Sequence, residues 1–338
     1  MAILKQTSEA VASVKKNAPK KVKKSKGRYI NPLTDFGFKL IFGTKEYLID
    51  FLNAVLGIVD GIVDLHYDNT ERPGLSEDDR TTIFDLYCTL GNGKHILIEM
   101  QYHPYEHFKE RTIYYASRMI QEQGEGKKGS EDWHYNFDSV YSVNIVNFNL
   151  EYESRSDADA TFDTIKTQKL PYASYIELRD RDTHQLFCDK LLLVFLELPY
   201  FTKKEHEVRD SIEWWMYILR NMATLKEIPD ALRNTFFESL FLKAEIAKLS
   251  KADRKKYNQS LKNVNDMNIV LADRERKISS LQNQNSSLQN QNSSLQNQNS
   301  SLQNQNSSLQ REVEELRRQL GLPATTAGRK PSLAKQTG

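Results

Sequence analysis

The sequence predicts an α/β protein with three successive parts: a mixed β-sheet flanked by helices, a helical region and a coiled coil. Three observations support this fold class. Short apolar runs with strand-like alternation are interspersed with helical patterns between residues 29 and 200. Residues 201–275 follow a helical pattern with an aromatic apolar face. Leucine then recurs every seven residues from Leu281 to Leu316, which is the spacing of a coiled coil.

The N-terminal residues are strongly basic, whereas the rest of the chain is mildly acidic. Residues 1–28 contain nine Lys or Arg and one acid, and the remaining 310 residues carry 38 basic and 44 acidic side chains. Because they show no apolar periodicity, residues 1–28 are predicted to form a disordered basic tail. Such a tail can bind nucleic-acid phosphates, or it can simply keep the chain in solution.

Cysteine content and hydropathy indicate the compartment. Cys88 and Cys188 lie in apolar, strand-like runs, which indicates buried thiols in a reducing environment. Their spacing matches no zinc site. No apolar run approaches the ~18 residues of a membrane span, and the N-terminus has no hydrophobic signal sequence. We therefore expect a cytoplasmic protein without membrane contact.

The most informative segment is a β-hairpin predicted over residues 81–102. Two apolar alternating runs flank the Gly-Asn-Gly turn at residues 91–93. A two-residue loop would set Asp85 opposite Met100 and turn each apolar row to the wrong face. A three-residue loop, with Gly93 in the left-handed conformation of a bulge, keeps both rows on the core side. We therefore expect the three-residue loop.

This register brings two acids together. It pairs Asp85 with Glu99, whose Cβ atoms then lie roughly 5 Å apart, and it pairs Ile83 with Gln101. The shared face also carries apolar side chains, so it is expected to be partly buried. Opposed like charges destabilise such a face unless a cation lies between them, and Mg²⁺ binds one or two carboxylates. The alternative is an outer face that carries two acids without any function.

The same residues resemble a known nuclease motif. An Asp on one strand followed by Glu-x-Lys on its partner marks the PD-(D/E)XK nucleases, and this chain has Asp85 followed by Glu99-Met100-Gln101. The Gln variant after an apolar strand resembles the Rpn family of recombination-promoting nucleases, also described as PD-(D/E)XK nuclease family transposases. The order of the flanking segments agrees, with residues 31–39 and 41–43 before the hairpin and residues 108–111, Tyr115 and 195–199 after it.

The resemblance covers residues 29–266 and implies both fold and activity. It implies a restriction-endonuclease-like core over residues 29–200 and a metal-dependent DNA endonuclease linked to recombination or mobile elements. Asp85, Glu99 and Gln101 would be the catalytic residues. Asp85 and Glu99 would hold Mg²⁺, for which Mn²⁺ would substitute. Gln101 is neutral where Lys is usual and cannot accept a proton, so reduced activity is expected.

Five further residues are candidates for the site. In the superfamily an acid on the first core helix often completes the metal site, and Asp35 occupies that place, although an Asp there can equally cap the helix. Lys39 lies one turn further and would supply the charge that Gln101 lacks. Arg80 precedes the hairpin and would bind a phosphate or an acid. Arg111 and Tyr115 share a helix face. Arg111 would clamp a phosphate or contact Glu99 as a supporting residue. Alternatively, Arg111 forms a surface ion pair and the Tyr115 ring belongs to the core.

The C-terminal region contains four identical heptads. Ser-Ser-Leu-Gln-Asn-Gln-Asn repeats from Ser279 to Asn306. Leucine at one seam position and asparagine at the other favour a parallel two-stranded coiled coil of limited stability, predicted over residues 276–320. The alternative is a disordered polar tract. Residues 321–338 are predicted to be a disordered tail. We expect a homodimer through the helical tail and the coiled coil.

Three functions are compatible with these residues. The first is the metal-dependent DNA endonuclease. The second is a catalytically weak or inactive module that binds DNA or self-assembles through the coiled coil. The third is a nuclease for RNA, which would use the same side chains. DNA is the partner expected under the first two.

Overall fold

The computed structural model describes residues 27–58, 61–72, 82–83, 85–124, 134–150 and 172–323. The two predicted tails therefore lie almost wholly outside the described residues, and so does Arg80. The chain divides into two compact units, Met1–Ile269 and Val270–Gly338.

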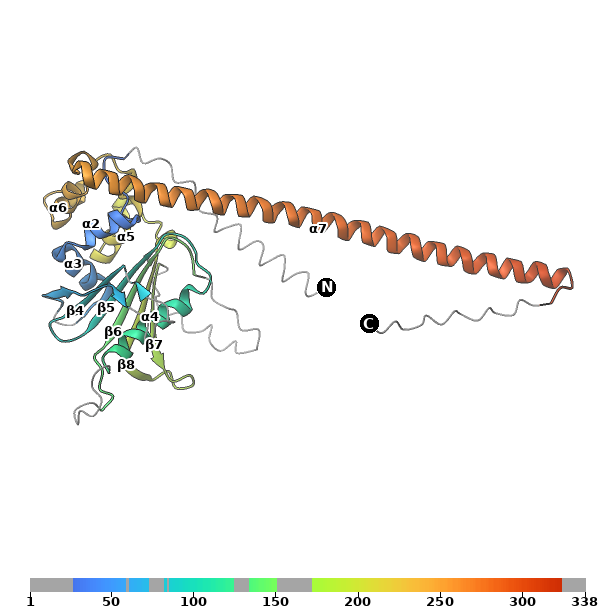
Figure 1. The fold of residues 1–338 in the computed structure, drawn as a ribbon, viewed down its shortest axis with the longest axis horizontal. Coiled ribbons are helices and arrows are strands. Elements are labelled where there is room, and N and C mark those ends of the chain that lie inside the picture. Colours follow the sequence, from blue (N-terminus) through green and yellow to red (C-terminus); the bar gives the residue numbers. More distant parts are fainter. Residues whose placement is uncertain are drawn as a thin grey trace. The chain divides into compact units, whose positions relative to one another are not determined.

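The first unit is built on a mixed six-stranded β-sheet, which confirms the predicted fold class (Figure 1). The strand order is β1-β4-β5-β6-β8-β7. The central pairs β5/β6 and β6/β8 are parallel, and the outer pairs are antiparallel. The strands are β1 (Leu65–Tyr67), β4 (Leu86–Leu90), β5 (His95–Gln101), β6 (Val140–Val146), β7 (Ala173–Arg179) and β8 (Leu186–Glu197), and a separate two-stranded sheet joins β2 (Glu71–Arg72) to β3 (Thr82–Ile83).

Helices cover both faces of the large sheet at its central strands, whereas most of β7 and the start of β8 are exposed. One face packs against a core that includes Phe38, Phe51 and Trp215, all less than 2% exposed. The other face packs through Leu97 against Met119 of α4. The helices are α2 (Asp35–Phe42), α3 (Lys45–Leu56), α4 (Phe108–Glu122), α5 (Ser211–Asn221), α6 (Phe236–Lys243) and α7 (Lys251–Gln319).

Helix α7 contains the heptads within one continuous helix of 69 residues. Its first turns belong to the core of the first unit, where Tyr257 is 2% exposed. None of the helices in the described ranges combines the length and the apolar character needed to cross a membrane.

The hairpin has the predicted register. Leu86 lies opposite Ile98, and Thr89 lies opposite His95. The N–H of Leu90 donates to the carbonyl of Lys94 at 2.9 Å, which leaves a loop of three residues. Gly93 has φ +85°, as a bulge glycine requires. Extending this register by one pair sets Asp85 opposite Glu99.

The predicted pairing of Ile83 with Gln101 is wrong. Ile83 pairs with Glu71 in the two-stranded sheet, and Gln101 pairs with Val146 of β6. The hairpin ladder ends at Leu86, because the chain bends at Asp85 and its N–H bonds to a side chain instead of a strand carbonyl. The bend therefore separates β3 from β4.

The apolar residues between Ile58 and Tyr67 predict a strand, but among those that the structure describes only Leu65–Tyr67 is extended in the sheet. Ile62 has no ladder partner because the Asn53 side chain takes both its backbone groups, at 2.5 Å to the N–H and 3.0 Å to the carbonyl. Gly61, at φ +67°, turns the chain beside this contact.

Gly93→Ala should lower the free energy of unfolding by about 1–2 kcal/mol, because an L-residue is strained at this left-handed φ. The added Cβ would also lie 3.0 Å from the carboxylate of Asp138. Urea unfolding provides the measurement. Gly91→Ala is the matched control, since a Cβ there meets nothing within 4 Å. Equal effects of the two substitutions would contradict the bulged loop.

Candidate active site

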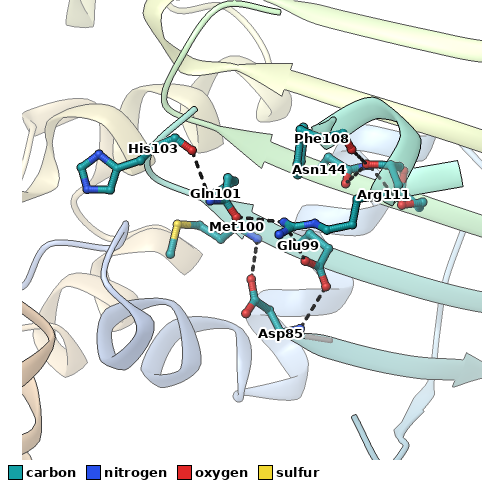
Figure 2. Close-up of polar contacts among 10 residues, drawn as sticks. Asp85, Glu99, Met100, Gln101, His103, Phe108, Arg111 and Asn144 are labelled. Carbon is teal, nitrogen blue, oxygen red and sulfur yellow. Dashed lines mark hydrogen bonds and ion pairs between the residues drawn. The ribbon is translucent and has the colours of Figure 1, made fainter. Parts of the chain in front are cut away.

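Asp85 and Glu99 are tied together through the hairpin backbone. The N–H of Met100 donates to Asp85 Oδ2 at 2.7 Å, and the N–H of Asp85 donates to Glu99 Oε1 at 3.2 Å (Figure 2). Each carboxylate is thus held by the strand that carries the other. The bend at Asp85 makes this exchange possible, because it frees the Asp85 N–H from the sheet ladder.

Burial makes two neighbouring charges unfavourable here. Glu99 is 7% exposed, and burial, followed by the charge of Asp85, raises the pKa of Glu99 to about 8. Burial also raises the pKa of Asp85, against the opposing effect of its hydrogen bond from Met100. Such a pair is stabilised in its ionised form by a cation between the carboxylates.

Arg111 of α4 brings a positive charge to the pair. Its Nη2 donates to Gln101 Oε1 at 2.9 Å and lies 3.7 Å from Glu99 Oε2 (Figure 2). The guanidinium carbon is 5.1 Å from the ring centroids of both Tyr105 and Phe108 and 5.6 Å from that of Tyr115. Three aromatic rings therefore hold Arg111 against the hairpin, within ion-pair distance of Glu99.

Gln101 is fixed at both ends of its amide. Its oxygen accepts from Arg111, and its Nε2 donates to the carbonyl of His103 at 3.2 Å. Gln101 is itself neutral, and the positive charge beside it is the guanidinium of Arg111 on α4.

Asp35 and Lys39 form an ion pair with each other at 2.7 Å, and both side chains are more than half exposed. The helix cap is Thr34, whose hydroxyl accepts from the N–H of Gly37, so Asp35 does not fill that role. The charge of Lys39 lowers the pKa of Asp85 and that of Asp35 raises it, which places this pair near the hairpin acids.

Asp85 and Glu99 are the two carboxylates that the structure brings together at the hairpin. Among the described residues, no group of three or more His, Cys, Asp or Glu side chains could hold a metal ion, so Asp35 does not join them. Two carboxylates with several waters or substrate oxygens suit Mg²⁺, and burial, the main cause of the raised pKa values, makes a further positive charge favourable for the ionised pair. The residues present therefore fit a hard divalent cation.

Asn144, which the motif does not include, lies beside Glu99 in the register of β5 and β6. It is fully buried, accepts from Thr112 Oγ1 at 3.3 Å and donates to the carbonyl of Val194 at 3.2 Å. It therefore links α4 to β8 next to the acids. Figure 2 shows Asn144 beside Arg111. A polar residue inside the apolar run of β6 was the available signal.

A family model described as PD-(D/E)XK nuclease family transposase matches residues 32–274. The chain belongs to this family. The resemblance noted in the hairpin motif is thereby confirmed, together with the fold that it implied. Comparisons with curated proteins and with solved structures each find no match.

Membership of the PD-(D/E)XK nuclease family transposases gives the hairpin acids a chemical context. The matched segment contains Asp85, Glu99, Gln101 and Arg111 and ends before the leucine heptads. Family membership suggests nuclease activity, for which a buried carboxylate pair beside an arginine is suitable. The heptads are an addition to the family's domain in this chain.

Proposed function

We propose that this protein is a metal-dependent endonuclease that hydrolyses phosphodiester bonds in DNA, with Mg²⁺ as cofactor and Mn²⁺ as a substitute, in recombination or in the movement of genetic elements. One observation carries the proposal: two buried carboxylates with raised pKa values are held together across the hairpin of a nuclease-family domain. A divalent cation is the partner that such a pair lacks.

Asp85 and Glu99 would hold the cation, which when bound stabilises charge on the scissile phosphate and makes a coordinated water more acidic. The hydrogen bonds from Met100 and from the Asp85 N–H fix the two carboxylates in advance, so little reorganisation is needed. Arg111 neutralises part of the charge on Glu99 and would bind a phosphate held at the pair. Tyr115 supports Arg111 through its ring.

Gln101 would orient a water or a phosphate oxygen, since Arg111 and His103 hold its amide in place. It cannot remove a proton from water, because an amide is neutral and weakly basic. The same fact favours a second candidate function, a slow or inactive module that binds DNA or assembles through α7. The two differ in whether DNA strands are cut.

Nicking of supercoiled plasmid distinguishes the candidates. The wild-type protein is expected to convert supercoiled to open-circular DNA with Mg²⁺ or Mn²⁺ and to stop when the cation is chelated. Binding without cleavage would support the inactive module. Cleavage of an RNA duplex in preference to DNA under the same conditions would move the substrate assignment to RNA.

We also propose that the protein is a homodimer joined by the heptads of α7. The six leucines at this seam have between 50% and 63% of their surface exposed: Leu281, Leu288, Leu295, Leu302, Leu309 and Leu316. A row of exposed leucines at seven-residue spacing on one helix is buried when a second copy pairs with it, and Asn at the other seam position favours two parallel strands. A dimer would allow two sites to act on two DNA strands.

Replacing Leu288, Leu295 and Leu302 together by Asn should convert the dimer to a monomer, because the central seam would lose its apolar contacts. Light scattering coupled to gel filtration gives the mass directly. The control replaces Ser287, Ser294 and Ser301 by Asn, which adds the same residues one position earlier, outside the seam. A wild-type monomer, or a leucine variant that remains dimeric, would contradict this role of α7.

A further inference from the structure

A basic groove lies beside the catalytic hairpin, between α2 and the first turns of α7. Its volume is about 820 Å³. Lys39 lines it from α2, and Lys255, Lys256, Gln259 and Asn263 line it from α7. All of these residues belong to the first compact unit of the chain. The groove is therefore part of the nuclease domain.

The lining of the groove carries an excess of positive charge. Three lysines face one acid, Asp35, which is already paired with Lys39 at 2.7 Å. Lys255 and Lys256 are exposed and form no ion pair with any acid that the structure describes. Two cationic side chains are thus available for an anionic ligand. Gln259 Nε2 donates to Asn263 Oδ1 at 2.9 Å, which leaves Asn263 Nδ2 as a further donor for a phosphate oxygen.

The spacing along α7 suits an extended ligand. The lining positions from Ala252 to Asn263 follow one face of the helix and span about 16 Å at ~1.5 Å per residue. Because a DNA strand winds around the duplex axis, a straight helix face of this length can contact a few successive phosphates of one strand. A small anion would use only part of such a face.

The two walls are held in place by buried hydrogen bonds. The N–H of Asn31 donates to the hydroxyl of Tyr257 at 2.8 Å, and the N–H of Phe36 donates to Ser260 Oγ at 3.3 Å. Tyr257 and Ser260 are the buried residues of α7. The start of α7 is therefore docked on the segment that leads into α2, and the groove exists before any ligand binds.

The groove is also close to the acids that would cut the DNA. Phe36 and Leu40, on the α2 wall, pack against the same core as Met100, whose N–H donates to the carboxylate of Asp85. DNA lying along α7 and over Lys39 would therefore pass near Asp85. This continuity distinguishes the groove from a basic patch elsewhere on the surface.

We propose that the groove between α2 and α7 binds the phosphate backbone of duplex DNA next to the scissile bond, with Lys255 and Lys256 as its main phosphate contacts. The proposal rests on the proposed nuclease function and adds to it the path of the substrate. It also gives the first turns of α7 a role separate from that of the heptads.

The test is the salt dependence of duplex binding by the full chain. Lys255 and Lys256 are replaced together by Gln, and binding to a labelled DNA duplex is measured by fluorescence anisotropy, with Ca²⁺ in place of Mg²⁺. The slope of log K against log salt is negative, and each phosphate contact contributes about 0.9 to its magnitude. Losing two contacts should therefore reduce the magnitude of the slope by roughly 1.8. Affinity at low salt should fall about tenfold or more.

The matched control replaces Lys204 and Lys226 by Gln, which removes the same charge from exposed positions outside the groove. This variant should keep the wild-type slope. An unchanged slope for the Lys255 and Lys256 variant, or equal losses in both variants, would overturn the proposal. Tighter lysine-dependent binding of an RNA duplex than of DNA would also overturn it.

Plasmid nicking separates this proposal from the proposed function. The groove variant keeps Asp85 and Glu99, so it should still nick plasmid when Mg²⁺ is present, at a lower rate when protein is limiting because it binds DNA less tightly. If the wild-type protein nicks DNA and the Lys255 and Lys256 variant keeps the wild-type salt slope, only the groove proposal is refuted. If the wild-type protein does not nick DNA but the variant shows the expected smaller salt slope, the nuclease proposal is refuted and the DNA-binding groove is supported.

Discussion

Asp85→Asn and Glu99→Gln should each lower Mg²⁺-dependent plasmid nicking by more than about 100-fold. Both substitutions keep the size of the side chain and an oxygen that can accept the present backbone hydrogen bond. They remove the negative charge that would hold the cation. The variants should remain folded, because each relieves the repulsion between buried carboxylates. Initial nicking rates and circular dichroism of the purified variants check both parts.

The control for these variants is Glu110→Gln. Glu110 lies on α4 near Arg111 in the chain, but it is exposed and contacts His107 instead of the hairpin acids. It should nick at the wild-type rate. Wild-type rates in both site variants would show that the nicking arises elsewhere in the protein or from a contaminant.

The second prediction concerns stability, which should fall as the pH rises in the absence of a divalent cation. Glu99 has an ordinary pKa of 4.5 and a folded-state pKa of about 8. Between these values the folded state holds a proton that the unfolded state has lost, so the free energy of unfolding decreases as the pH increases. Because a shift of one pKa unit corresponds to 1.36 kcal/mol, we expect a loss of about 2–4 kcal/mol between about pH 5 and about pH 8.

Added Mg²⁺ should restore most of this stability at about pH 8 and little at about pH 5, where Glu99 is protonated. A cation at 100 times its dissociation constant adds about 2.7 kcal/mol. Urea unfolding with and without Mg²⁺ at both pH values gives the comparison. Glu99→Gln should show a smaller pH dependence and no gain from Mg²⁺. Stabilisation of that variant to the wild-type extent would place the cation at another site.

The hairpin could be predicted from sequence because its determinants are local. Alternating apolar rows on either side of a Gly-Asn-Gly turn allow one register that buries both rows, and this register sets Asp85 opposite Glu99. The cap of α2 and the left-handed Gly57 at the end of α3 follow similar short-range patterns.

Other features depend on contacts that alternation cannot show. The extended pairing of Ile83 failed because the N–H of Asp85 bonds to a side chain, which ends the ladder. The short β1 follows from two hydrogen bonds between Asn53 and Ile62. In both cases a side chain takes the hydrogen bond that a neighbouring strand would otherwise make with the backbone.

Long-range contacts were the least accessible to prediction. The groove joins α2 to α7 across more than 200 residues, and no local pattern relates Phe36 to Ser260. The aromatic rings around Arg111 lie near it in the sequence. The four-residue spacing of Arg111 and Tyr115 indicated one of these three contacts. The contact of Arg111 with Gln101 required the docking of α4 on the sheet.

Anomalous diffraction from crystals soaked in Mn²⁺ tests the shared cation most directly. The proposed site predicts one anomalous peak between the Asp85 and Glu99 carboxylates, at roughly 2.1 Å from an oxygen of each, which is the distance that Mg²⁺ prefers. Soaked crystals of Glu99→Gln should lack it. Carboxylates that turn away from each other, with no peak between them in the wild-type protein, would contradict the metal-dependent mechanism.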